Sequence, residues 1–187
     1  MNSVAVKGLC LALFGALTIG FGHLFGLDLD QVALLGVALG GVVGLVPDRT
    51  LTWRIGGFLV GFAVAWAGYA MRAGMLPDTA AGRAVVVFGV LVVLVAVAAV
   101  SAENVPLWAM LVGSAAMVGA YEQTYAASPS LFLTDSPTAA TTVLLAAALG
   151  VAGSMLIGEP AEKRQSVLGQ RRQYTGPTAV ETKGSVA

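Results

Sequence analysis

Residues 84–100 read AVVVFGVLVVLVAVAAV, a stretch without a single polar side chain. The many valines do not argue for a strand, because an isolated strand cannot satisfy its backbone hydrogen bonds in lipid. A helix needs about 20 apolar residues to span a bilayer. Five further apolar stretches lie between residues 4 and 158, and almost every charge falls between them. The pattern predicts an all-α fold, a polytopic membrane protein built as a six-transmembrane-helix bundle.

The composition supports the same class of protein. The chain has 187 residues, of which 57% are hydrophobic and 11% are charged, whereas a soluble domain carries about 25% charged residues. We therefore expect one transmembrane domain over residues 1–158 and a short basic, disordered cytoplasmic tail over residues 159–187. No small-residue cleavage site follows the first apolar stretch, so it is expected to be a retained span and not a signal peptide.

Cap and turn residues set the expected bounds of the spans. Pro47 ends the second span, Asn104 caps the fifth, and Ser136 with Pro137 begins the sixth. Residues 122–135 are expected to form a longer loop on the membrane surface, with a re-entrant segment as the alternative. Most other connections are short, so sequential spans should form antiparallel hairpins. The six expected spans cover residues 4–27, 31–46, 53–75, 84–100, 105–121 and 137–158.

The distribution of basic residues predicts the orientation. With the N-terminus inside, only Arg72 and Arg83 fall on the outer side. The inner side then holds Lys7, Arg49, Arg54, Lys163, Arg164, Arg171, Arg172 and Lys183. This asymmetry predicts cytoplasmic N- and C-termini. The arrangement also places Trp53 and Trp108 at the inner interface, and Tyr121 and Tyr125 at the outer one, as in an aromatic belt. The composition, rich in Ala, Val and Gly and with more Arg than Lys, favours a GC-rich prokaryotic source, so the expected location is a prokaryotic cytoplasmic membrane.

The middle of the predicted bilayer holds no ionisable side chain. The charged residues of three spans lie near opposite ends, from which they can snorkel to the two interfaces. Proton relays and cation-coupled transporters usually need ionisable groups at mid-depth, so proton coupling is not expected. The pairs that bracket these spans are Lys7 and His23, Arg54 and Arg72, and Glu103 and Glu122.

Residues for catalysis and metal binding are sparse. Cys10 is the only cysteine and His23 the only histidine, so a Cys–His pair or a Cys-based metal cluster is not expected. His23 with Asp28 and Asp30 could suggest a metal site, but these groups would have to converge from a helix end and a loop. Residues 22–28 resemble a short stretch of a nickel-permease family, without that family's fuller acidic and histidine pattern, and no function is carried over. We expect no enzyme, metal, cofactor or nucleic-acid partner.

Small residues recur every four positions in two spans. They form one stripe in the second span and another in the third, made of Gly36, Gly40 and Gly44, and of Gly57 and Gly61. Such stripes let helix backbones approach closely. We interpret them as helix-packing faces within the chain, and the two stripes could serve each other across the short turn that joins their spans. The alternative is an interface in a homo-oligomer or with another membrane protein.

Two functions remain open. The first is a non-catalytic accessory, assembly or structural subunit of a membrane complex, which the scarcity of polar groups favours. The second is a small channel or carrier for an uncharged or weakly polar solute, with Thr18, Ser114, Thr142 and Ser154 as candidate lining residues. Hydroxyls that meet in one cavity would favour the channel. Scattered hydroxyls, with glycine stripes that face lipid, would favour the subunit.

The tail carries its own candidate site. Lys163, Arg164, Arg171 and Arg172 are expected to bind anionic lipid headgroups or a cytoplasmic partner, since each basic residue near an anionic leaflet contributes about 1 kcal/mol.

Replacing Arg171 and Arg172 together with Gln should loosen the tail from the membrane by about 2 kcal/mol without unfolding the helices. The rate of protease cleavage of the tail in anionic liposomes measures this attachment, and zwitterionic liposomes serve as the control. A cleavage rate equal to that of the unmodified protein would contradict lipid attachment.

Overall fold

The computed structural model describes residues 8–9, 12–17, 19–20, 32–75, 79–102 and 104–157, and its regular elements are all helical. The all-α prediction is therefore confirmed for this part of the chain. The basic tail, with Lys163, Arg164, Arg171 and Arg172, lies outside it. The elements are α2 (Ala33–Leu45), α3 (Leu51–Met75), α4 (Ala80–Val100), α5 (Leu107–Ala127), a 3-10 turn η1 (Pro129–Leu131) and α6 (Phe132–Ile157).

Within the described residues, three segments are long and apolar enough to cross a membrane: Leu51–Met75, Ala80–Val100 and Pro129–Leu156. The α2 helix has 13 residues, and at 1.5 Å per residue it is only about 20 Å long. The α5 helix has 21 residues, but its C-terminal turns carry Glu122, Gln123 and Thr124. Length and composition in the described part thus support a membrane protein with three candidate spans.

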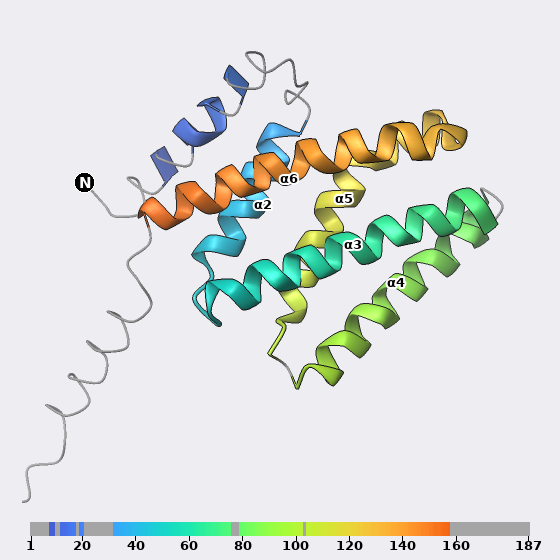
Figure 1. The fold of residues 1–187 in the computed structure, drawn as a ribbon, viewed down its shortest axis with the longest axis horizontal. Coiled ribbons are helices and arrows are strands. Elements are labelled where there is room, and N and C mark those ends of the chain that lie inside the picture. The colour runs from blue at the N-terminus through green and yellow to red at the C-terminus, as the bar shows by residue number, and fades with distance from the viewer. Residues whose placement is uncertain are drawn as a thin grey trace, which may run out of the picture.

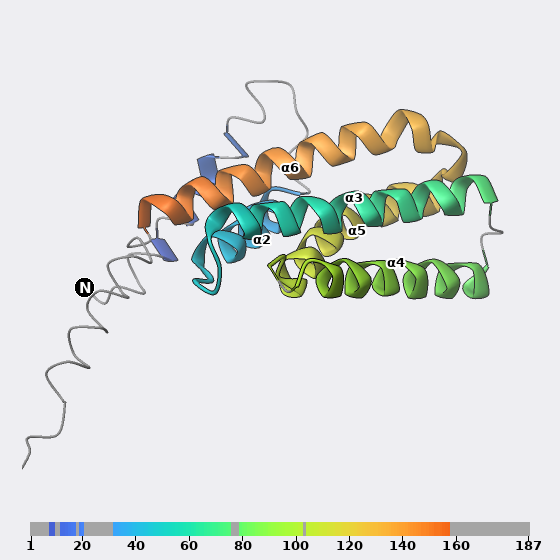
Figure 2. The same ribbon diagram turned by 60° about the horizontal axis from the view of Figure 1, so that its bottom comes forward.

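The helices are arranged in layers. Figures 1 and 2 show α3 and α5 side by side in the middle, with α6 on one side of them and α4 on the other. The α2 helix lies against α6, and α3 lies against α5. In both pairs the residue numbers of the contacting positions increase together along the two helices, so the helices of each pair are parallel. Spans that alternate in direction produce this arrangement. Three helices separate α2 from α6 and one separates α3 from α5, and an odd number of intervening helices gives both members of a pair the same direction.

The α2–α6 pair is a backbone-to-backbone contact. A Cβ atom added to Gly36 would lie 2.4 Å from the Cβ of Ala146, and one added to Gly40 would lie 1.9 Å from the carbonyl oxygen of Ala147. On the opposite helix, a Cβ atom at Gly150 would lie 2.3 Å from the carbonyl oxygen of Val37. A side chain at these positions would push the helices apart.

The α3–α5 pair is equally close. A Cβ atom at Gly61 would lie 1.8 Å from the carbonyl oxygen of Met110, and one at Gly113 would lie 1.9 Å from that of Phe58. At Gly57 the nearest atom would be the Cβ of Ala109, 3.2 Å away.

The glycine stripes of α2 and α3 therefore do not serve each other, and that prediction is wrong. The α2 stripe, including Gly44 against Ser154, meets α6, while the α3 stripe meets α5. The turn between α2 and α3 joins only the helix ends and does not fix which faces meet. Each stripe packs against a helix that has small residues of its own at the contact. For the α2 stripe this helix is α6, and for the α3 stripe it is α5.

Three predicted boundaries are also wrong. Residues 122–135 are not a long loop, because α5 continues to Ala127 and α6 begins at Phe132. Pro137 therefore lies inside α6, and the hydroxyl of Ser136 accepts a hydrogen bond from Trp66 Nε1 at 3.0 Å instead of capping the helix. Asn104 donates to the carbonyl oxygen of Ser101 at 2.9 Å. The cap residue of α5 is Pro106, without a side-chain cap.

Arg54 closes the corner between α2 and α3. Its side chain binds backbone carbonyls of the protein instead of extending toward water as expected, and the residue is only 7% exposed. Its Nη1 donates to the carbonyl oxygens of Val43 at 2.8 Å, Gly44 at 3.0 Å, and also Val46. These carbonyls belong to the C-terminal turn of α2, where helix carbonyls lack partners in their own helix and the helix dipole favours a cation.

We expect Gly61→Ala to destabilise the protein, since the added methyl group would meet the backbone of α5. Overpacking typically costs about 1–3 kcal/mol of the free energy of unfolding. Gly56→Ala in the same helix is the matched control, because nothing lies within 4 Å of its Cβ position. That variant should gain up to about 1 kcal/mol from helix propensity. Thermal unfolding in one detergent measures both variants, and equal midpoints would contradict the close contact.

Candidate functional site

The three predicted lining hydroxyls that the structure describes, those of Ser114, Thr142 and Ser154, do not meet in one cavity. Ser114 Oγ donates to the carbonyl oxygen of Gly61 at 2.8 Å, Thr142 Oγ1 to that of Thr138 at 2.7 Å, and Ser154 Oγ to that of Val151 at 2.6 Å. Thr18 lies outside the described residues. The hydroxyls scatter, as the subunit interpretation expects, but the glycine stripes face other helices of the chain and not lipid.

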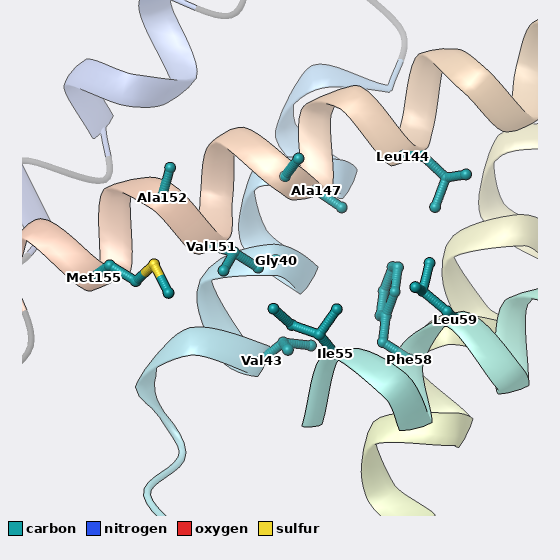
Figure 3. A pocket seen from close by; sticks show the side chains of 11 residues that line it. Gly40, Val43, Ile55, Phe58, Leu59, Leu144, Ala147, Val151, Ala152 and Met155 are labelled. Carbon is teal, nitrogen blue, oxygen red and sulfur yellow. The ribbon is translucent and has the colours of Figure 1, made fainter. Parts of the chain in front are cut away.

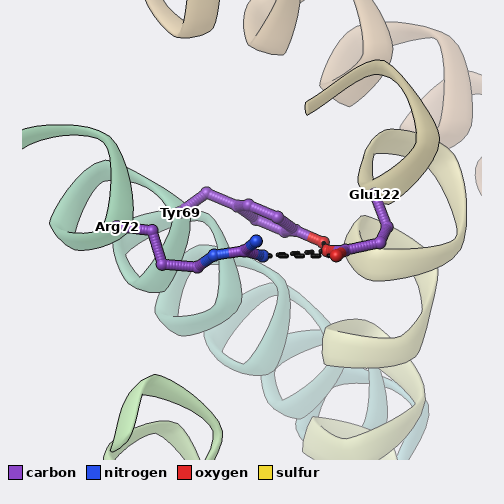
Figure 4. A network of polar contacts seen from close by, with 3 residues as sticks. All are labelled: Tyr69, Arg72 and Glu122. Carbon is purple, nitrogen blue, oxygen red and sulfur yellow. Dashed lines mark hydrogen bonds and ion pairs between the residues drawn. The ribbon is translucent and has the colours of Figure 1, made fainter. Parts of the chain in front are cut away.

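The most concentrated polar chemistry lies between α3 and α5, near the C-terminal ends of both helices (Figure 4). Tyr69 donates its hydroxyl to Glu122 Oε2 at 2.5 Å, and Arg72 Nη1 lies 3.0 Å from the same oxygen. Tyr69 and Arg72 share a face of α3 because they are three residues apart. The Arg72 side chain is 9% exposed and that of Glu122 is 40% exposed, so this charge-assisted network is partly shielded from solvent.

Aromatic rings surround this network. The guanidinium carbon of Arg72 lies 4.4 Å from the ring centroid of Tyr125 and 5.4 Å from that of Tyr69, which are cation–π distances. Tyr121 packs edge-on against Tyr69 at 5.3 Å between centroids. Tyr121 and Tyr125 are buried, so the prediction that they form an interfacial belt is wrong. Both tyrosines lie within α5, which continues to Ala127, and their rings pack against Tyr69 of α3.

A cavity of about 490 Å³ adjoins the network, between α3, α4 and α5. Its polar border consists of Tyr69, Arg72, Arg83, Ser114 and Glu122. The rest of the described wall is aliphatic, and is formed by Ala65, Val86, Val87, Val90, Leu91, Leu111, Ala115 and Val118. The cavity is thus charged at one end and apolar along its length.

A second pocket, of about 370 Å³, lies between α2, α3 and α6 (Figure 3). Gly40, Ile55, Phe58, Leu144 and Met155 are among its lining residues, and none of the described lining residues has a polar side chain. Such a wall offers nothing to orient a polar solute, since specificity for one requires placed donors and acceptors.

The sequence pattern did not reveal the Tyr69–Arg72–Glu122 network. Arg72 and Glu122 were each interpreted as residues that mark a span end. The available signal was that both lie near the expected outer ends of parallel spans, at the same depth. Among the described residues, no group of three His, Cys, Asp or Glu side chains could hold a metal ion.

Comparisons of this chain with protein families, with curated proteins and with solved structures found no match.

The bond between Tyr69 and Glu122 should appear as a coupling free energy in a double-mutant cycle. Tyr69→Phe and Glu122→Gln each remove one partner, and we expect the two effects to be non-additive by about 1 kcal/mol, a charge-assisted hydrogen bond reduced by solvent at Glu122. Unfolding by denaturant in one detergent provides the four free energies.

Tyr121→Phe is the matched control for this cycle, because the Tyr121 hydroxyl is buried without a hydrogen-bond partner. It should be additive with Glu122→Gln and close to neutral alone. Equal coupling for both tyrosines would contradict a specific bond from Tyr69.

Proposed function

We propose that the protein is a non-catalytic accessory, assembly or structural subunit of a membrane complex. The observation that carries the proposal is that its interior polar groups bind the protein itself. Arg54 binds the carbonyls at the end of α2, Ser114 binds a carbonyl of α3, and Tyr69 and Arg72 bind Glu122. These groups join helices together instead of lining a common path for a solute.

The same proposal includes six spans with both termini in the cytoplasm of a prokaryotic cell. The excess of basic residues on one side supports this orientation. The parallel α2–α6 and α3–α5 pairs also support it, because they are what alternating spans require. The short α2 helix would need local thinning of the bilayer or flanking residues to complete its span.

The α4 helix supplies the surface for a partner in this proposal. Only 6% of its most apolar 18-residue window is buried inside the chain, against 44% for the windows in Leu51–Met75 and Pro129–Leu156. Val85, Phe88, Val92 and Val95 follow one another at spacings of three and four residues, and are 58%, 71%, 48% and 55% exposed. This spacing places them on one face of the helix, as in a seam that packs against another helix.

A small carrier for an uncharged or weakly polar solute is the second candidate. The cavity between α3, α4 and α5 favours it, because Ser114 and the charged residues border an otherwise apolar volume of about 490 Å³. Solute flux into liposomes that contain the purified protein tests this candidate.

The mass and composition of the particle extracted with its native lipids test the subunit proposal. We expect a stoichiometric partner, either a second copy or another membrane protein, and Phe88→Ala should weaken its retention by about tenfold, as for the loss of a buried aromatic anchor. Leu133→Ala is the matched control, because Leu133 is 84% exposed and lies on α6, away from α4. A bare single copy from the unmodified protein would contradict the proposal and favour the carrier.

A further inference from the structure

We infer that the cavity between α3, α4 and α5 binds one anionic phospholipid, with its phosphate at Arg72 and Arg83 and an acyl chain along α4. This inference goes beyond the proposed function and does not depend on it. It is carried by three features of the cavity, namely the charge at one end, the length of the apolar wall, and the side on which the wall is open.

The charged end favours an anion. Arg72 and Arg83 both border the cavity, and Glu122 is the one carboxylate among the lining residues that the structure describes. Among the described lining residues, the two guanidinium groups therefore outnumber the one carboxylate. Arg83 also lies in the first turn of α4, whose N-terminus is capped by Thr79. The dipole at a helix N-terminus favours an anion there, and the planar donors of arginine suit phosphate oxygens.

The apolar wall has the length of one leaflet. From Arg83 to Leu91, α4 rises about 12 Å, and from Glu122 back to Leu111, α5 spans about 16 Å. Half of the hydrocarbon core of a bilayer is about 15 Å thick. Both Leu91 and Leu111 line the cavity. An acyl chain that begins at the charged end would therefore reach the bilayer midplane along these residues.

The wall is open toward the outside of the bundle, where lipid would lie. Val87 and Leu91 on α4, and Leu111, Ala115 and Val118 on α5, line the cavity and are also exposed. Few residues of α4 are buried, namely Gly82, Val86 and Leu94, so α4 leaves a groove beside α5. A water-soluble metabolite would gain little from this wall, whereas an acyl chain would cover it.

Native mass spectrometry of the full-length protein in detergent tests the inference. The protein is titrated with phosphatidylglycerol and with phosphatidylcholine of the same acyl chains. We expect one phosphatidylglycerol to bind in preference to phosphatidylcholine. Arg83→Gln should weaken this binding about fivefold, the effect of about 1 kcal/mol for one basic residue. Arg49→Gln is the matched control, because Arg49 is exposed at the opposite end of α3 and should leave binding unchanged.

A second variant tests the cavity without changing charge. Ala115→Phe places a ring in the groove and should reduce lipid occupancy at least tenfold, while Ala96→Phe, at an exposed position of α4 away from the cavity, should not. Thermal unfolding checks that both variants fold. If Arg83→Gln leaves lipid binding unchanged, the occupancy of Ala115→Phe decides whether the cavity binds the lipid. Equal binding of the two lipids would overturn the inference. So would unchanged occupancy in folded Ala115→Phe, which would assign the lipid to another surface such as the basic tail.

Discussion

The close approach of helix backbones at glycine is the constraint on which the rest of this structure depends. In lipid, helices gain little from hiding apolar surface, so their association depends on van der Waals packing and on polar bonds between them. Gly40 against Ala147 and Gly61 against Met110 bring two pairs of helices to backbone contact. Once α3 and α5 are joined in this way, Tyr69 and Arg72 come within bonding distance of Glu122. The α4 helix, which has little such surface, is left at the edge.

Polar side chains add hydrogen bonds and an ion pair between helices, in addition to the glycine contacts. These bonds lie at both ends of α3. Near its start, Arg54 holds the carbonyl oxygens of α2, and Trp108 from α5 donates its indole N–H to Asp48 in the same corner. Near its end, Arg72 and Tyr69 hold Glu122 of α5. The second end differs in that it borders the cavity with α4, so its charges can contact a ligand as well as stabilise the helix pair. The proposed partner surface and the proposed lipid site use different residues of α4, namely Val85, Phe88, Val92 and Val95 for the first and Val86, Val87, Val90 and Leu91 for the second.

The sequence predicted the type of element well and the partners of each element poorly. Apolar runs and turn residues were enough for the all-α fold and for the ends of α2 and α3, because these depend on neighbouring residues. The pairing of Gly40 with Ala147 depends on residues about a hundred positions apart, and no local pattern encodes it. Arg54 and Arg72 were interpreted as residues that reach toward water, since the acceptors that hold them belong to other helices. Pro137 suggested a helix start, but residues before it could extend the helix by one turn and more.

The pairing of α2 with α6 also sets an order in which the chain can be assembled during synthesis. The helix that covers the α2 glycines ends at Ile157, so it leaves the ribosome after every other helix described here. The α3–α5 pair can form earlier, because both of its members precede α6. Among the described residues, what holds the short α2 helix before α6 arrives is Arg54 and a few contacts with α3 and α5. The glycine face of α2 therefore lacks its α6 partner until the last described helix has been synthesised.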